Sequence, residues 1–86
     1  MTYFWQSGYP IMVQTNADGY PYLLLWDWFS GKQMIAEITD HWVVSDPWDD
    51  QWEKRDYYGV VTETGLALII FLNGLTQAWY IQWVFD

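Results

Sequence analysis

The chain contains no cysteine, so it can form neither a disulfide bond nor a thiolate metal site. This absence fits a reducing compartment such as the cytoplasm. The N-terminus also lacks the basic region and the long apolar core of a signal peptide. The longest unbroken apolar run, residues 66–72, is far shorter than a membrane span. We therefore expect a cytoplasmic protein that does not insert into a membrane.

Basic side chains are scarce. Lys32, Lys54 and Arg55 stand against eleven Asp and Glu residues, which gives a formal net charge of -8. Proteins that bind nucleic acid draw most of their affinity from Lys and Arg side chains that neutralise phosphates. We therefore expect no direct nucleic-acid binding, and the same argument disfavours anionic membrane surfaces.

The sequence also lacks recognisable catalytic and metal-binding motifs. His41 is the only histidine, and no Ser or Cys nucleophile is placed beside it by any motif. The acidic residues between 46 and 56 do not follow the ligand order of a calcium loop, so a solvated acidic loop is predicted instead. The sequence predicts no catalytic residue, no cofactor and no metal site.

Apolar and aromatic residues are abundant instead. Hydrophobic residues make up 52% of the 86 residues, and the chain carries eight Trp, seven Tyr and four Phe. Such a chain is too apolar to be disordered, and its length predicts a single small domain over residues 1–86. So many large rings cannot all be buried in a small core, and exposed aromatic clusters are typical of interaction sites.

The order of apolar runs and turn residues predicts strands throughout the chain. We expect strands at residues 10–15, 20–28, 32–39, 56–64, 66–72 and 78–85, with a short aromatic segment at 3–5 and an extension at 40–44. Turns are expected at residues 16–19, 30–31, 65 and 73–74. A two-residue tip at 30–31 would pair Trp26 with Ile35. Residues 45–55 show no clear period and predict an irregular loop, with a helical turn from Pro47.

The fold class that follows is all-β. We predict a small antiparallel sheet or partly open barrel of five to six strands with one irregular acidic loop. The predicted core includes five apolar residues of the C-terminal half: Val60, Leu68, Ile70, Trp79 and Val84.

The C-terminal hairpin is apolar on both faces. In a strand successive side chains point to opposite faces, so Leu68 and Ile70 share one face while Ile69 and Phe71 share the other. A small antiparallel sheet normally buries one face and exposes the other to water. The second apolar face must therefore meet another sheet, another copy of the chain or a partner.

Trp and Tyr dominate binding hot spots, and this second face offers several large apolar side chains. We predict a partner-binding surface centred on Ile69, Phe71 and Trp83. The aromatic residues of segment 26–29 would contribute to it if they lie on the same face. The predicted partner-binding residues are Trp26, Trp28, Phe29, Met34, Ile69, Phe71 and Trp83.

Three stretches, AEITDHW at 36–42, DYYGVVTETGL at 56–66 and AWYIQWVFD at 78–86, resemble a bacterial family of small all-β domains of unknown function. Some members are associated with error-prone, Y-family-like polymerase proteins. The resemblance implies no catalytic residues. The chain departs from it by carrying apolar residues or glycine where the family is more basic or polar, at Leu23, Leu24, Trp28, Met34, Gly59, Ile69, Leu72 and Trp83. This departure suggests a β scaffold that has been resurfaced for binding.

The sequence thus predicts a non-enzymatic binding module, an engineered or resurfaced β scaffold that binds a protein partner through an aromatic and aliphatic sheet face. If it is engineered, it is a recombinant protein without a native compartment. An acidic rim would favour a basic partner surface. The alternatives are an accessory domain of a bacterial DNA-repair assembly, a homodimer formed through the apolar face, and a carbohydrate-binding module that stacks sugars on its Trp side chains.

Overall fold

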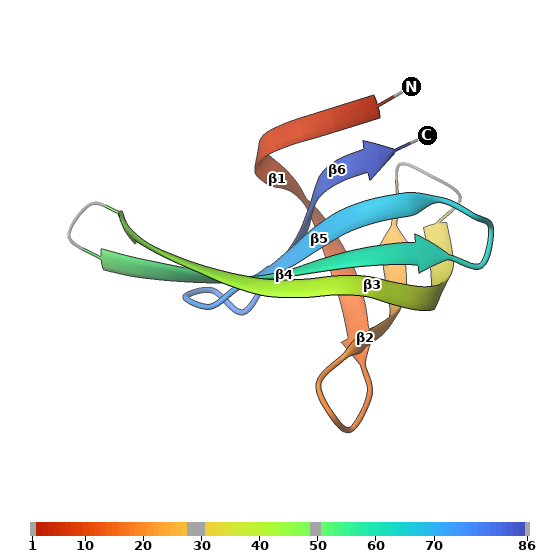
Figure 1. Ribbon diagram of the computed structural model, residues 1–86, viewed down its shortest axis with the longest axis horizontal. Coiled ribbons are helices and arrows are strands. Elements are labelled where there is room, and N and C mark those ends of the chain that lie inside the picture. Colours follow the sequence, from red (N-terminus) through yellow and green to blue (C-terminus); the bar gives the residue numbers. More distant parts are fainter. Residues whose placement is uncertain (1, 28–30, 49–50, 86) are drawn as a thin grey trace.

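The computed structural model describes residues 2–27, 31–48 and 51–85, which form six antiparallel strands. They are β1 (Thr2–Thr15), β2 (Pro21–Trp26), β3 (Gly31–Trp48), β4 (Gln51–Thr62), β5 (Ala67–Asn73) and β6 (Trp79–Phe85). Each strand pairs with the next, and β1 pairs with β6, so the sheet closes into a ring (Figure 1). The all-β antiparallel prediction is confirmed. The ring is closed rather than partly open, but strands of 6 to 18 residues do not make a regular barrel.

Strand β1 closes the ring because it pairs on both sides. Its residues 2–4 and 9–11 pair with β6, and its residues 12–15 pair with β2. Between these two parts the pairing is irregular, and the chain bends near Gly8. The predicted strand at 10–15 and the aromatic segment at 3–5 are therefore parts of one long bent strand.

The predicted irregular loop at residues 45–55 is wrong, and so is the helical turn at Pro47. The β3–β4 ladder continues through Ser45 opposite Lys54 and Pro47 opposite Trp52 to Trp48 opposite Gln51. Figure 1 shows this hairpin extending past the neighbouring strand β5. A hairpin that projects beyond the ring is not sandwiched between a core and solvent, so its sequence need not alternate between apolar and polar residues.

The β2–β3 connection also differs from the prediction. Trp26 pairs with Gly31 and not with Ile35, so the predicted two-residue tip at 30–31 and its register are wrong. Residues 28–30 lie outside the described part of the chain. The turn at 16–19 is confirmed: the Gly19 amide donates to the Asn16 carbonyl, and the Asn16 side chain accepts from the amides of Asp18 and Tyr20.

The hydrophobic core fills the interior of the ring. All six strands contribute to it, either with buried side chains or with half-buried ones that pack against them. The buried core residues are Leu24, Trp26, Tyr58, Val60, Leu68, Ile70, Trp79, Ile81 and Val84. All five predicted core residues are among them. Across residues 2–27, 31–48 and 51–85 there is no helix that could span a membrane.

Candidate functional site

The outer face of strands β3 to β6 carries a continuous row of aromatic side chains. Trp42, Tyr57, Phe71 and Tyr80 are direct cross-strand neighbours on four successive strands. Their ring centroids are 5.3, 5.2 and 5.2 Å apart along the row. Aromatic cross-strand pairs of this kind stabilise a sheet. The row therefore forms a second, thin apolar layer outside the ring.

Phe71 lies in the middle of this layer and is 0% exposed. The Arg55 guanidinium covers the ring, with Cζ 4.6 Å from the ring centroid. Tyr57 and Tyr80 flank it. Phe71 lies on the outer face as predicted but is not exposed there, because its neighbours on the same face bury it.

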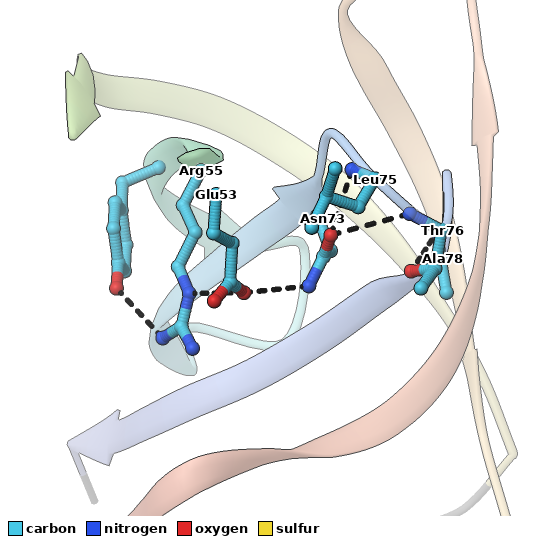
Figure 2. A network of polar contacts seen from close by, with 7 residues as sticks. Glu53, Arg55, Asn73, Leu75, Thr76 and Ala78 are labelled. Carbon is cyan, nitrogen blue, oxygen red and sulfur yellow. Dashed lines mark hydrogen bonds and ion pairs between the residues drawn. The ribbon is translucent and has the colours of Figure 1, made fainter. Parts of the chain in front are cut away.

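A polar network holds Arg55 in this position (Figure 2). Arg55 Nε donates to Glu53 Oε1 at 3.0 Å, and one terminal nitrogen donates to the Tyr57 hydroxyl at 3.3 Å. The same Glu53 oxygen accepts from Asn73 Nδ2 at 2.7 Å. Arg55, one of only three basic residues, is thus engaged within the fold.

A second row beside the first is more open to solvent. It runs from Asp40 on β3 over Gly59 and Ile69 to Trp83 and Phe4 in direct cross-strand register. The Phe4 and Trp83 rings are 4.4 Å apart. Phe4 is 49% exposed.

Phe85 extends this open surface along β6. Its ring stacks on Trp83 at 5.7 Å with an interplanar angle of 5°, and it is 43% exposed. We call the surface formed by Phe4, Trp42, Ile69, Trp83 and Phe85 the outer patch.

A groove of about 240 Å³ opens in the outer patch where Gly59 provides no side chain. Strand β3 contributes Asp40 and Trp42 to its walls, strand β5 contributes Ala67 and Ile69, and Phe85 contributes from β6. A Cβ atom on Gly59 would lie 2.8 Å from the Thr39 hydroxyl oxygen, so a larger residue would not fit without movement. We call this hollow the Gly59 groove.

The outer patch depends on a bulge in β6. Ile69 pairs with Trp83 but Ile70 pairs with Ile81, so Gln82 is an extra residue on β6. Strict alternation would place Trp83 on the inner face with Trp79 and Ile81. The bulge shifts the alternation by one residue, which turns Trp83 outward and Val84 into the core.

The predicted site residues do not form one surface. Ile69 and Trp83 lie directly opposite each other in the outer patch. Met34 is exposed but pairs with Leu23 on the β2 side of the ring. Trp26 is 1% exposed and belongs to the core, so it does not share the outer face with Ile69 and Trp83. Trp28 and Phe29 lie outside the described residues.

Sequence reasoning did not single out Phe4, Trp42 or Phe85. Phe4 reaches the patch only because β1 closes the ring against β6, a pairing between the two ends of the chain. Phe85 lies on the outer face because it follows the bulge in β6, and no sequence motif predicts that bulge. Trp42 lies in the predicted strand extension at 40–44, but nothing in the sequence assigned it to a face.

Three residues that depart from the resembled family serve the fold. Leu23 and Leu24 are buried, and Leu72 packs against the core. Their apolar character needs no binding role. The apolar residues Ile69 and Trp83 are not explained by the core in this way, because their side chains lie on the outer face.

Two tyrosine hydroxyls outside the outer patch have raised pKa values, and one of these rings stacks on the single histidine. His41 stacks on Tyr58 with ring centroids 4.3 Å apart. Burial raises the pKa of Tyr58, and the negative charge of Asp56 acts in the same direction. The hydrogen bond that Tyr9 donates to Asp27 raises the pKa of Tyr9. Within the described ranges no group of three or more His, Cys, Asp or Glu side chains could hold a metal ion.

Comparison with protein-family models, with curated proteins and with solved structures finds no match to this chain. The structure supports the coarser part of the resemblance, a small all-β domain of six antiparallel strands. The assignment to a family stays a prediction.

Proposed function

We propose that the protein is a non-enzymatic binding module that docks a protein partner on the outer patch. The observation that carries this proposal is the contact of the half-exposed Phe4 and Phe85 rings with the partly buried Trp83 ring, beside a largely apolar groove. Large aromatic side chains bury much area at low entropic cost, and they concentrate binding energy in protein interfaces.

The charge of the chain supports a basic partner. Eleven acidic residues against three basic ones give a net charge of -8. Opposite charge on a partner accelerates encounter and disfavours incorrect pairing. A second copy of the chain carries the same excess of negative charge, which favours a different partner over a homodimer.

The outer patch contains apolar residues that the core does not require. Ile69 and Trp83 lie outside the core, and polar side chains at these positions would leave the interior of the ring unchanged. We propose that these residues were selected for binding, in a resurfaced scaffold or in an accessory domain that works through protein contacts.

The test compares three forms of the protein as bait in a bacterial extract: wild type, Trp83→Ala and Leu75→Ala. Leu75 is a matched control because it is an apolar residue, 54% exposed, in the β5–β6 loop outside the patch. We expect a protein that wild type and Leu75→Ala retain and that Trp83→Ala loses. After purification of that protein, Trp83→Ala should weaken its binding by about 2 kcal/mol, or roughly 30-fold.

Light scattering of wild type over a wide concentration range completes the test. We expect a monomer. A dimer at all concentrations that becomes a monomer in Trp83→Ala would reassign the patch to self-association. Equal partner binding by all three folded forms would contradict the proposed surface.

A further inference from the structure

We propose that the Gly59 groove is a binding site for an arginine side chain presented by the partner. This inference rests on the proposed function, and it names the chemistry that the outer patch recognises. The groove holds about 240 Å³, below the usual range of small-molecule pockets and suited to one large side chain.

The groove is polar at one end and apolar along its length. Asp40 lies at the β3 end, and its carboxylate makes no hydrogen bond or ion pair with the rest of the described chain. Trp42 lies beside it on the same face, with its ring partly exposed. Ala67 and Ile69 provide apolar walls on β5. An available carboxylate, an aromatic ring and an apolar wall match the guanidinium and the methylene groups of an arginine.

A second carboxylate adds to the negative potential at this end. Glu37 is exposed and pairs with Val61, one outward-facing position along β3 from Asp40. The bulges in β3 keep Glu37, Asp40 and Trp42 on the outer face, because each is opposite an outer-face position of β4. A cationic side chain that enters the groove would therefore meet negative charge from two positions.

The same face already holds one arginine in such a setting. Arg55 lies over the Phe71 ring at 4.6 Å and donates to the Glu53 carboxylate at 3.0 Å. Asp40 and Trp42 offer the corresponding pair of groups without a cation. Arg55 is engaged with Glu53 and Phe71, and no Lys or Arg among the described residues forms an ion pair with Asp40, so a cation in the groove would come from another molecule.

The groove is also placed for a docked partner. Trp42, Ile69 and Phe85 belong both to its walls and to the outer patch. A partner that covers the patch can insert one side chain into the groove while the surrounding rings exclude water, an arrangement typical of hot spots.

The probe for this site is N-acetyl-arginine methylamide, titrated into the 15N-labelled full chain and followed by two-dimensional NMR. N-acetyl-citrulline methylamide is the neutral control of nearly the same shape. We expect saturable shifts of the Asp40, Gly59 and Ile69 amides and of the Trp42 indole. Binding of the citrulline compound should be at least 5-fold weaker, because it lacks the charge.

Asp40→Asn should weaken binding of the arginine probe at least 5-fold. Asp18→Asn is the matched control, since it removes the same charge from the exposed turn between β1 and β2 and should change binding less than 2-fold. Ala67→Leu should also weaken binding, because it fills the groove without changing the charge. The weaker binding of Asp40→Asn and Ala67→Leu supports the site only if the NMR spectra of these variants show the native fold.

Shifts that map elsewhere, or equal losses in Asp40→Asn and Asp18→Asn, would overturn the groove as an arginine site. These outcomes are independent of the capture experiment. If the probe fails while Trp83→Ala still loses the partner, the outer patch stands without the groove. If the probe binds while Trp83→Ala retains the partner, the arginine site stands and the proposed docking surface fails.

Discussion

Gly8 determines how closely β1 can approach the outer face of β5 and β6. Its φ is 86°, a region that side-chain-bearing residues rarely adopt, and a Cβ atom there would lie 2.7 Å from Tyr80 Cβ and 2.9 Å from Phe71 Cζ. The backbone of β1 thus covers the aromatic row directly. At the scale of single residues, the burial of Phe71 depends on this glycine as well as on Arg55.

Gly8→Ala should therefore destabilise the protein through both backbone strain and steric overlap. Gly19→Ala is the matched control, because Gly19 has the same φ of 86° but no atom within 4 Å of the added Cβ. We expect Gly19→Ala to cost about 1 kcal/mol and Gly8→Ala about 2 kcal/mol more. Urea unfolding measures both. Equal losses in the two variants would mean that the packing around Gly8 adapts freely.

At the scale of elements, the β5–β6 loop is tied to β4 by the Asn73 side chain and by the Gly74 amide, which donates to the Lys54 carbonyl at 2.7 Å. Asn73 Oδ1 accepts hydrogen bonds from the Leu75 and Thr76 amides at 2.9 and 3.2 Å (Figure 2). Its Nδ2 donates to the Glu53 carboxylate, which in turn binds Arg55. The loop, the start of β4 and the cover over Phe71 form one connected unit.

Asn73→Ala should lower the free energy of unfolding by about 1–2 kcal/mol, because it removes the loop acceptor and leaves Glu53 without one donor. Asn73→Asp retains the acceptor but places a second carboxylate beside Glu53. Chemical denaturation at neutral pH should show both variants less stable than wild type, with the Asp variant recovering part of its loss in 0.5 M salt. Wild-type stability in Asn73→Ala would contradict the role of this network.

At the scale of the whole molecule, closure of the ring buries Tyr58, and it also places Tyr9 of β1 within hydrogen-bond distance of Asp27 after β2. Burial raises the pKa of Tyr58 above its usual value of 10, and the hydrogen bond to Asp27 raises that of Tyr9. Both groups keep their protons in the folded state at pH values where the unfolded chain has lost them. The stability that they contribute is present below pH 10 and is lost as the pH rises further.

The free energy of unfolding should consequently fall as the pH rises above 10. Tyr58→Phe removes one of the two tyrosines with a raised pKa and should make this fall shallower. Urea unfolding between pH 8 and pH 11 measures the difference. Identical slopes for the two proteins would show that Tyr58 does not contribute.

The parts of the fold that depend on local pattern could be predicted from the sequence. Val60, Leu68, Ile70, Trp79 and Val84 are core residues, and the Asn16–Gly19 segment is a turn, as their residue types indicate. The candidate site was predicted less well. Ile69 and Trp83 are neighbours, but Trp26 and Phe71 are buried, and Phe4 and Trp42 were not foreseen.

The sequence by itself determined the β class, the single apolar core and the excess of apolar residues beyond that core, because strand pattern and composition act over a few residues. Only the tertiary structure decided where that excess lies. Pairing of β1 with β6 brought Phe4 onto Trp83, the bulge at Gln82 turned Trp83 outward, and Arg55 and Gly8 covered Phe71. These outcomes depend on contacts between residues far apart in the chain, and a register shift of one residue reverses which face a side chain occupies.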